Sequence, residues 1–371
     1  MKKILSLLLI LALLLSGCTS ISPSIGTEPS VNATAPTQAV NPTEPSQPAG
    51  TEAPTDPAAT EIAPTEHAPT DPAPTETVPT EPAPTEPQPT QPPATEPAPT
   101  QPKPTEPPVP AGSFNIHFID VGQADCALIE CDGEYILIDG GNKDDGQLVV
   151  SYLQKQGVTE LELVIGSHAH EDHIGGLAGV LAVYPTRNVW CPVKSYNSQA
   201  FRNFKNYADQ QGRELIKPAV GTVFAFGSAT VTVLGPVKSY SDPNNTSIVV
   251  MVQYGNNRFL FTGDMESDAE SDLLNSGANV KADLLKVGHH GSYTSTSYRF
   301  LREVAPKYAV ISVGAGNSYG HPHDDPLSRL RDAEVMTYRT DILGTVIVSS
   351  DGTNLSFTWQ KTSAQPSIPA V

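Results

Sequence analysis

The chain has 371 residues and a formal net charge of −18, with 40 acidic side chains against 22 basic ones. Residues 113–371 are long enough for one substantial hydrophobic core, or two smaller ones. So acidic a chain gives no general reason to expect nonspecific binding of polyanions, and a nucleic-acid substrate would need a local basic surface.

Residues 1–18 have the composition of a lipoprotein signal peptide. Two lysines precede an apolar run over residues 4–15, which is too short for a comfortable permanent membrane span. Leu15-Ser16-Gly17-Cys18 follows and resembles the lipobox of bacterial lipoproteins. The resemblance implies cleavage before Cys18 and a lipid on its sulfur, hence a membrane anchor on the extracytoplasmic face. An ordinary signal peptide with a chance cysteine is the alternative.

Residues 19–112 form a second region, rich in Pro and Thr and nearly free of large apolar side chains. Motifs such as Ala83-Pro84-Thr85-Glu86-Pro87 recur with a loose five-residue rhythm. Because apolar side chains are scarce, no core can offset the entropy of ordering this region, and dense proline favours extended chain. We therefore expect a disordered stalk here, followed by one folded domain over residues 113–371.

The folded region alternates clusters of short strands with helices. Hydrophobic alternation and turn residues predict strands over residues 114–120, 124–130, 135–138, 162–165, 222–226, 230–234, 248–253, 258–261, 283–287, 308–313, 334–338, 345–348 and 355–359. Helical spacing predicts helices over residues 147–156, 174–184, 197–211, 266–275, 297–304 and 326–331. The alternation predicts an α/β layered domain without specifying which one.

Three cysteines lie in the folded region, at Cys126, Cys131 and Cys191. An odd number cannot pair completely, and none of the spacings is that of a metal-binding or redox motif. We expect buried core residues, with a Cys126–Cys131 disulfide as the alternative.

Seven of the nine histidines fall into three short clusters, at residues 168–173, 289–290 and 321–323. The densest is Ser167-His168-Ala169-His170-Glu171-Asp172-His173, which follows an apolar strand and precedes a helix. Imidazoles and a carboxylate at this density suit a divalent metal ion. Gly175-Gly176 would let the helix start pack closely beside this loop. A solvated His-rich loop is the alternative.

The HxHxDH pattern after a hydrophobic strand resembles the signature of metallo-β-lactamase-fold hydrolases. Further matching segments follow in the order that this resemblance implies, namely Ile136-Leu137-Ile138-Asp139-Gly140-Gly141, Phe261-Thr262-Gly263-Asp264 and Leu285-Lys286-Val287-Gly288-His289-His290-Gly291-Ser292. The likeness covers nearly all of residues 113–371 and implies a metallo-β-lactamase-like four-layer αββα sandwich.

One branch of the family is more similar. Its resemblance rests on Asp120-Val121-Gly122-Gln123-Ala124-Asp125, Asn244-Asn245-Thr246-Ser247 and Tyr319-Gly320-His321-Pro322. These segments resemble the hydrolase domain of the bacterial DNA-uptake protein ComEC. That domain is associated with DNA degradation, and related folds include phosphodiesterases.

The resemblance implies a site for one or two divalent ions. The implied ligands are His168 and His170 for the first metal, Asp172, His173 and His289 for the second, and Asp264 as the bridge. The third histidine that the family usually gives to the first metal is missing, because no histidine lies between His173 and Asp264. Asn245 or Ser247 could approach that place instead.

These ligands predict a hydrolase. Zinc suits imidazole and carboxylate ligands, with manganese as an alternative, and a metal-bound water with a pKa lowered to about 7 would supply hydroxide. Asp172 would also orient the reacting groups. His290 and His321 are candidates for contacting the oxyanion or protonating the leaving group, with hydrogen bonding to a ligand as the alternative. Asp139 is expected to hold the ligand loop through backbone N–H groups.

Three functions compete for this site. We expect a phosphodiesterase or nuclease acting outside the membrane on a phosphodiester-containing substrate, with DNA as a candidate. The alternatives are a hydrolase of teichoic acid or of a lactam or lactone ring, and a metal-poor binding module without turnover. Residues 191–218 combine five basic side chains with interleaved aromatics, which could grip a single strand. The spacing of Phe201, Phe204 and Tyr207, however, favours a core role for these three.

Overall fold

The computed structural model describes residues 112–369 of the chain. The predicted signal peptide with Cys18, and the predicted stalk apart from Gly112, lie outside the described residues. Among the helices of residues 112–369, none combines the length and the apolar character needed to cross a membrane.

An eight-stranded sheet forms one half of the fold. In spatial order its strands are β15 (Leu355–Trp359), β14 (Val346–Ser350), β1 (Phe114–Phe118), β2 (Ala127–Cys131), β3 (Glu134–Ile138), β4 (Leu163–Ile165), β5 (Val189–Trp190) and β6 (Leu215–Ile216). Pairing is antiparallel from β15 to β3 and parallel from β3 to β6. Strands β1, β3 and β4 therefore all end at the same edge of this sheet.

A seven-stranded sheet forms the other half. In spatial order its strands are β13 (Met336–Arg339), β12 (Tyr308–Ile311), β11 (Leu284–Lys286), β10 (Asn257–Phe261), β9 (Val249–Tyr254), β8 (Ala229–Gly235) and β7 (Val223–Phe226). Strands β10 to β13 are parallel, whereas β10, β9, β8 and β7 are successively antiparallel. The loops after β10, β11 and β12 consequently leave this sheet at one edge.

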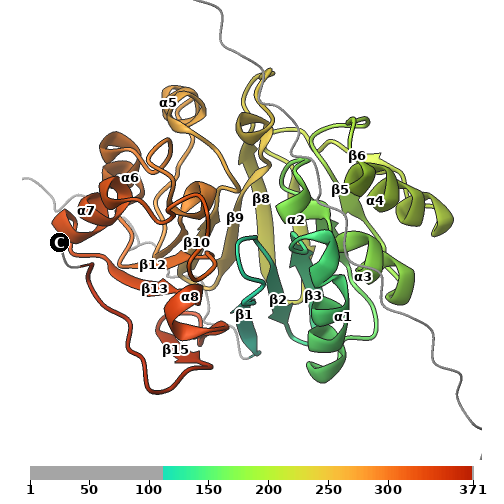
Figure 1. The fold of residues 1–371 in the computed structure, drawn as a ribbon, viewed down its shortest axis with the longest axis horizontal. Helices are drawn as coiled ribbons and strands as arrows, with labels where there is room; N and C mark the ends of the chain where they lie inside the picture. The colour runs from blue at the N-terminus through green and yellow to red at the C-terminus, as the bar shows by residue number, and fades with distance from the viewer. Residues whose placement is uncertain (1–111, 370–371) are drawn as a thin grey trace, which may run out of the picture. The chain divides into compact units, whose positions relative to one another are not determined.

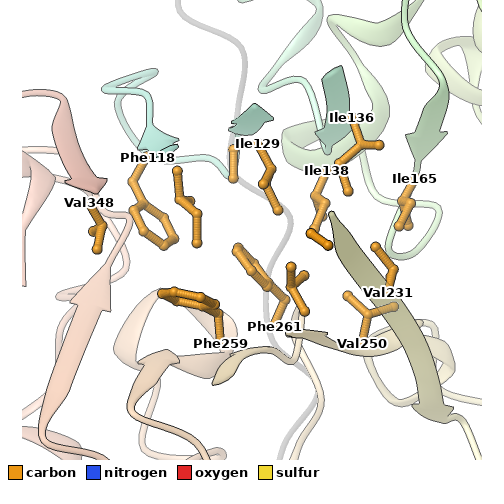
Figure 2. Close-up of a cluster of buried hydrophobic side chains, with 14 of the residues drawn as sticks. Phe118, Ile129, Ile136, Ile138, Ile165, Val231, Val250, Phe259, Phe261 and Val348 are labelled. Carbon is orange, nitrogen blue, oxygen red and sulfur yellow. The ribbon is translucent and has the colours of Figure 1, made fainter. Parts of the chain in front are cut away.

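The two sheets pack face to face over an apolar core. Side chains alternate between the two faces of a strand, so every second residue can point into this layer. Figure 2 shows Phe118, Ile129 and Ile138 of the first sheet facing Val250 and Phe261 of the second. The rings of Phe118 and Phe261 stack with centroids 5.7 Å apart. This packing holds the two sheets in a defined relative position.

Helices cover the outer face of each sheet (Figure 1). Helices α1 (Gly146–Lys155), α3 (Leu177–Val183) and α4 (Gln199–Gln210) pack on the first sheet, and α5 (Ser267–Asn275), α6 (Tyr298–Val304) and α7 (Asp324–Asp332) on the second. The remaining short helices are α2 (Glu171–Ile174), α8 (Thr340–Leu343) and three 3₁₀ turns, Lys143–Asp145, Asn244–Thr246 and Gly288–Gly291. The layers run helix, sheet, sheet, helix, which confirms the four-layer αββα prediction.

The helix predicted over residues 174–184 corresponds to α3, which begins three residues later than predicted, after Gly175 and Gly176; the short helix α2 precedes this pair. A Cβ atom on Gly175 would lie 2.3 Å from the backbone nitrogen of Lys143, and one on Gly176 would lie 2.1 Å from the carbonyl oxygen of Gly140. Only glycine allows such close backbone approach, so the close packing predicted for this pair is confirmed. The glycine pair lets α2 turn toward the edge where the strands end.

Two predictions about single side chains also agree with the structure. Cys126, Cys131 and Cys191 are buried and free, so the core role is confirmed and the disulfide is not formed. Phe201 and Phe204 are buried against the first sheet, so their predicted core role is confirmed, whereas Tyr207 is only half-buried and packs at the edge of this core.

Candidate metal centre

The candidate site lies where strands of both sheets end. Asp139 directly follows β3, and the loop over residues 167–173 follows β4. Asp264 follows β10 of the second sheet, and His289 and His290 follow β11. Loops at the ends of rigid strands can hold reactive groups in fixed positions. Side chains from the loops of the two sheets contact one another.

The tightest cluster of ligating groups consists of Asp172, His173, Asp264 and His290. One ligand atom from each lies within 4.8 Å of the others. His173 Nε2 is 3.2 Å from Asp264 Oδ2, and His290 Nε2 is 3.2 Å from Asp172 Oδ2. Three of the four residues are buried, and Asp172 is the partly exposed member. Two imidazoles and two carboxylates converging in this way are typical ligands for a divalent ion.

Two atoms of these residues, His173 Nε2 and Asp264 Oδ1, are buried without a hydrogen-bond partner. Although His173 Nε2 lies 3.2 Å from Asp264 Oδ2, it forms no hydrogen bond there. Buried polar atoms almost always have a partner, because leaving one unsatisfied is costly. A cation among the four side chains would satisfy His173 Nε2. The residues therefore fit the divalent ion that the fold implies.

Further imidazoles adjoin Asp264. The Nε2 atoms of His168 and His289 each lie 3.8 Å from Asp264 Oδ2. His168 Nε2 also lies 3.1 Å from Nδ1 of His170. All six ligands predicted from the sequence are thus gathered at this edge, together with His290.

His290 rather than His289 lies in the tight cluster. Its Nε2 lies 3.2 Å from Asp172 Oδ2, the contact with a ligand that was the alternative prediction for His290. Both His289 and His290 have left-handed backbone, with φ of 49° and 52°. Such conformations cost of the order of 1–3 kcal/mol each in non-glycine residues and are found mainly at functional sites. The left-handed turn directs His290 to Asp172, while His289 Nδ1 lies 3.1 Å from Thr294 Oγ1.

Asp139 holds the His-rich loop in place. Its Oδ1 accepts the Ser167 N–H at 2.7 Å and its Oδ2 accepts the Ser167 hydroxyl at 2.8 Å. The same Oδ2 lies 2.9 Å from His173 Nδ1. Because Nδ1 is bonded to the carboxylate, Nε2 of His173 is presented to the cluster. These contacts confirm the loop-holding role predicted for Asp139.

Sequence reasoning missed a buried ion pair beneath His290. Lys286 Nζ lies 2.9 Å from Asp125 Oδ2, and both side chains are buried. Asp125 Oδ1 is 3.4 Å from His290 Nδ1, which also lies 3.0 Å from the carbonyl oxygen of Ser312. The one available signal was a lysine at the end of the apolar strand Leu284–Lys286.

Carboxylates control the pKa values of the buried imidazoles. Burial alone lowers the pKa of His173 and His290, but nearby carboxylates, with Asp264 foremost, outweigh it. The pKa of His173 is held well above its usual value, and that of His290 rises to about 10. Burial dominates at His168 and lowers its pKa well below the usual value. Protons and a cation therefore compete for the nitrogens of His173 and His290.

A cavity of about 360 Å³ opens over the cluster. It is lined by Gln123, His170, Glu171, Asp172, Asn244, Asp264, His289, His290, Tyr319 and His321. The metal-ligating groups are thus accessible to a substrate of modest size.

His321 lies at the wall of this cavity and outside the tight cluster. Its Nδ1 is 3.3 Å from Gln123 Nε2, while Gln123 Oε1 accepts the Gly314 N–H at 3.0 Å. The amide is thereby oriented so that Nε2 donates to His321 Nδ1. Burial and the neighbouring imidazoles of His290 and His289 lower the pKa of His321 to about 4. His321 is therefore a neutral ring that carries its proton on Nε2.

Asn245 and Ser247 stand behind Asp264. The Glu266 N–H donates to Asn245 Oδ1 at 3.0 Å. The Asp264 N–H donates to Ser247 Oγ at 3.0 Å, and this hydroxyl donates to the carbonyl oxygen of Asn244 at 2.7 Å. Both side chains are therefore engaged in shaping the Asp264 turn, whereas Asn244 faces the cavity.

Two of the five basic side chains over residues 191–218 pair with acidic residues of the same segment. Lys194 forms an ion pair with Glu214, and Lys205 pairs with Asp209 at 2.7 Å. Arg213 donates to the carbonyl oxygen of Thr186. Because Phe201 and Phe204 are buried, the segment lacks the phenylalanine rings that base stacking would need.

Comparison with known proteins agrees with this geometry. Residues 119–315 match the family described as the metallo-beta-lactamase superfamily. The chain is 28% identical over 250 residues to ComE operon protein 3 of Bacillus subtilis, covering 62% of this chain and 32% of that protein. It is 31% identical over 243 residues to recombination protein 2 of Haemophilus influenzae, covering 64% and 29%. Competence protein ComA of Neisseria gonorrhoeae is 30% identical over 239 residues, covering 64% and 32%.

The chain therefore spans about a third of the length of these relatives. They are ComEC-family proteins, so the resemblance to that branch is confirmed. Among solved structures, the metallo-beta-lactamase fold protein YhfI of Bacillus subtilis aligns with a TM-score of 0.44 at 12% identity, covering 66% of this chain and 100% of that one. Because the family match extends over more than half of its residues, this chain belongs to the metallo-beta-lactamase superfamily.

Proposed function

We propose that this chain is a metal-dependent phosphodiesterase that acts on the extracytoplasmic face of a membrane, where a lipid on Cys18 anchors it. One observation carries the catalytic part. Four side chains from the loops of two sheets converge, namely Asp172, His173, Asp264 and His290. Two of them, His173 and Asp264, each have a buried atom without a hydrogen-bond partner. The names of the competence and recombination proteins that it resembles support DNA as a candidate substrate.

The proposed ligands of one divalent ion, zinc or manganese, are these four side chains. His168, His170 and His289, with Asp264 as the bridge, are the proposed ligands of a second ion. In this arrangement His289 takes the place of the family's third histidine at the first metal. A bound cation would polarise the phosphodiester and lower the pKa of a water molecule.

The remaining residues of the site orient the proposed ligands. Asp139 fixes the ring of His173 through its Nδ1 atom, and the carbonyl oxygen of Ser312 does the same for His290, with the Asp125 carboxylate nearby. His321 is neutral and presents its Nε2–H at the cavity wall, which suits a hydrogen bond to a developing oxyanion. The partly exposed Asp172 lies where it would also orient the attacking group.

The rest of the chain is proposed to position this domain. A signal peptide over residues 1–18 and a stalk over residues 19–112 would place the folded domain, residues 113–371, at a distance from the membrane. A stalk of this kind gives the site access to extended substrates outside the cell.

The experiment uses the full chain loaded with zinc or manganese. Its substrates are bis-p-nitrophenyl phosphate, nicked and single-stranded DNA, and the lactam nitrocefin. We expect cleavage of the phosphodiesters, and loss of that activity together with bound metal in His173→Ala. His323→Asn is the matched control, because it removes an imidazole outside the proposed ligand set.

Three results would contradict the proposal. Cleavage of nitrocefin alone would point to a lactam hydrolase. Bound metal without turnover of any substrate would favour a binding module. Unchanged metal content in His173→Ala, measured by elemental analysis, would show that the proposed ligand set is wrong.

A further inference from the structure

The cavity over the cluster offers a substrate little positive charge of its own. Among the ten residues described as lining it, none is lysine or arginine. A phosphate group would therefore be held by imidazoles and bound metal, and the rest of a substrate needs another kind of contact. Tyr319 lines this cavity with 67% of its surface exposed.

Tyr319 ends a stack of rings that begins in the metal cluster. The ring of His290 lies nearly parallel to that of His321, with centroids 6.3 Å apart and an interplanar angle of 23°. The ring of His321 in turn lies nearly parallel to that of Tyr319, at 5.6 Å and 22°. Among the described residues, the Tyr319 ring has no other aromatic neighbour, so its surface is left to solvent.

The loop that carries Tyr319 is held by one side chain. Asn317 Oδ1 accepts the N–H groups of Tyr319 at 3.1 Å and His321 at 3.0 Å. Asn317 Nδ2 donates to the carbonyl oxygens of Gly314 at 3.0 Å and His321 at 2.6 Å. The exposed ring is thus preorganised, which lowers the entropy lost when a ligand stacks on it.

We propose that Tyr319 is a stacking platform that selects phosphodiesters carrying a flat ring, such as a nucleobase, next to the bond that is cleaved. This inference rests on the proposed phosphodiesterase function. Removal of a base-stacking aromatic weakens binding by about 10- to 100-fold, whichever base is stacked. Tyr319 would thereby distinguish nucleic acids from polyol phosphates, which have no ring to stack.

The test compares Tyr319→Ala and Tyr319→Phe on two substrates. One is a single-stranded oligonucleotide, and the other is the same strand with every base replaced by an abasic residue. We expect kcat/KM of Tyr319→Ala to fall about 10- to 100-fold on the first and to equal that of the unsubstituted chain on the second. Tyr319→Phe should retain activity on both. Tyr298→Ala, which removes a tyrosine of similar exposure outside this cavity, is the control.

Equal loss on both strands would show a structural role and overturn the inference, as would no loss on either. A second readout separates this inference from the proposed function. An oligonucleotide containing 2-aminopurine should lose fluorescence on stacking against the full chain, and less so against Tyr319→Ala. Quenching without cleavage would preserve the platform and reject the phosphodiesterase. Cleavage combined with equal quenching by the unsubstituted chain and Tyr319→Ala would support the phosphodiesterase and reject the platform.

Discussion

His290 is held by groups that do not themselves face the cavity. Its Nδ1 lies near Asp125 and the carbonyl oxygen of Ser312, and Asp125 is paired with the buried Lys286. A carboxylate or carbonyl on one ring nitrogen fixes the tautomer and directs the other nitrogen toward a metal. The lysine keeps this carboxylate ionised, and despite burial the pKa of Asp125 is held well below its usual value.

Replacing Lys286 should lower the free energy of unfolding. Lys286→Met leaves Asp125 buried without its partner, which typically destabilises a protein by about 3–5 kcal/mol. We expect a loss of this size in urea unfolding of the metal-free chain. Lys281→Met, at an exposed position, should stay within about 0.5 kcal/mol of the unsubstituted protein. If the two variants unfold alike, the ion pair does not have this role.

The sequence identifies most of the site because ligating residues cluster in it. His168, His170 and His173 stand within six positions, and Asp264 ends a strand. The placement of His290 rather than His289 in the cluster could not be predicted, because it depends on left-handed backbone at both residues. Gly288 and Gly291 flank this turn, but histidine itself gives no signal of a positive φ.

At the scale of elements, the junction between α2 and α3 decides where His173 stands. The pair Gly175-Gly176 lets α2 end against the backbone of residues 140–143. The N–H of Gly140 donates to the carbonyl oxygen of His173 at 2.7 Å, which joins this junction to the end of β3. The position of His173 thus depends on backbone contact as well as on its own side-chain bonds.

A methyl group at this junction should disturb both stability and metal binding. In Gly175→Ala the new Cβ would lie 2.3 Å from Lys143 N. Overpacking of this kind costs about 1–3 kcal/mol, and the shift of α2 should lower the metal content. Gly179→Ala is the matched control, since its Cβ would lie 3.4 Å from the nearest atom. Equal unfolding midpoints and equal metal content for the two variants would contradict this account.

Long elements could be predicted and very short ones could not. Strands such as Ala229–Gly235 show clear alternation of buried and half-buried residues. Strands β5 and β6 have two residues each, too few to show a period, and they form only because a parallel sheet extends past β4. The helix predicted from residue 174 begins only at Leu177, because the glycine pair packs against the backbone of residues 140–143.

At the scale of the whole molecule, the site joins the two sheets. Asp172 and His173 come from the first sheet, and Asp264 and His290 come from the second. The Asp264 carboxylate of the second sheet raises the pKa values of His173 on the first sheet and of His290 on the second. Protonation and cation binding at the site are therefore linked to the docking of the two halves.

This linkage predicts how the metal-free protein responds to pH. The pKa of His290 is about 10 in the folded state against 6.5 for an ordinary histidine. Its proton therefore stabilises the fold fully below pH 6.5, and this contribution is lost as the pH rises through 10. The difference in unfolding free energy between the EDTA-treated chain and His290→Asn should shrink over that interval in urea titrations. A difference that stays constant would contradict the raised pKa. Metal affinity should rise over the same range.

Because the proposed ligands are divided between two sheets, folding and metal binding of a newly made chain would follow a fixed order. The imidazoles at residues 168–173 are synthesised well before Asp264 and His290, and neither group alone surrounds a cation. With the proposed ligand set, a cation would be retained only after both halves have folded and met, so metal binding would be a late step in folding.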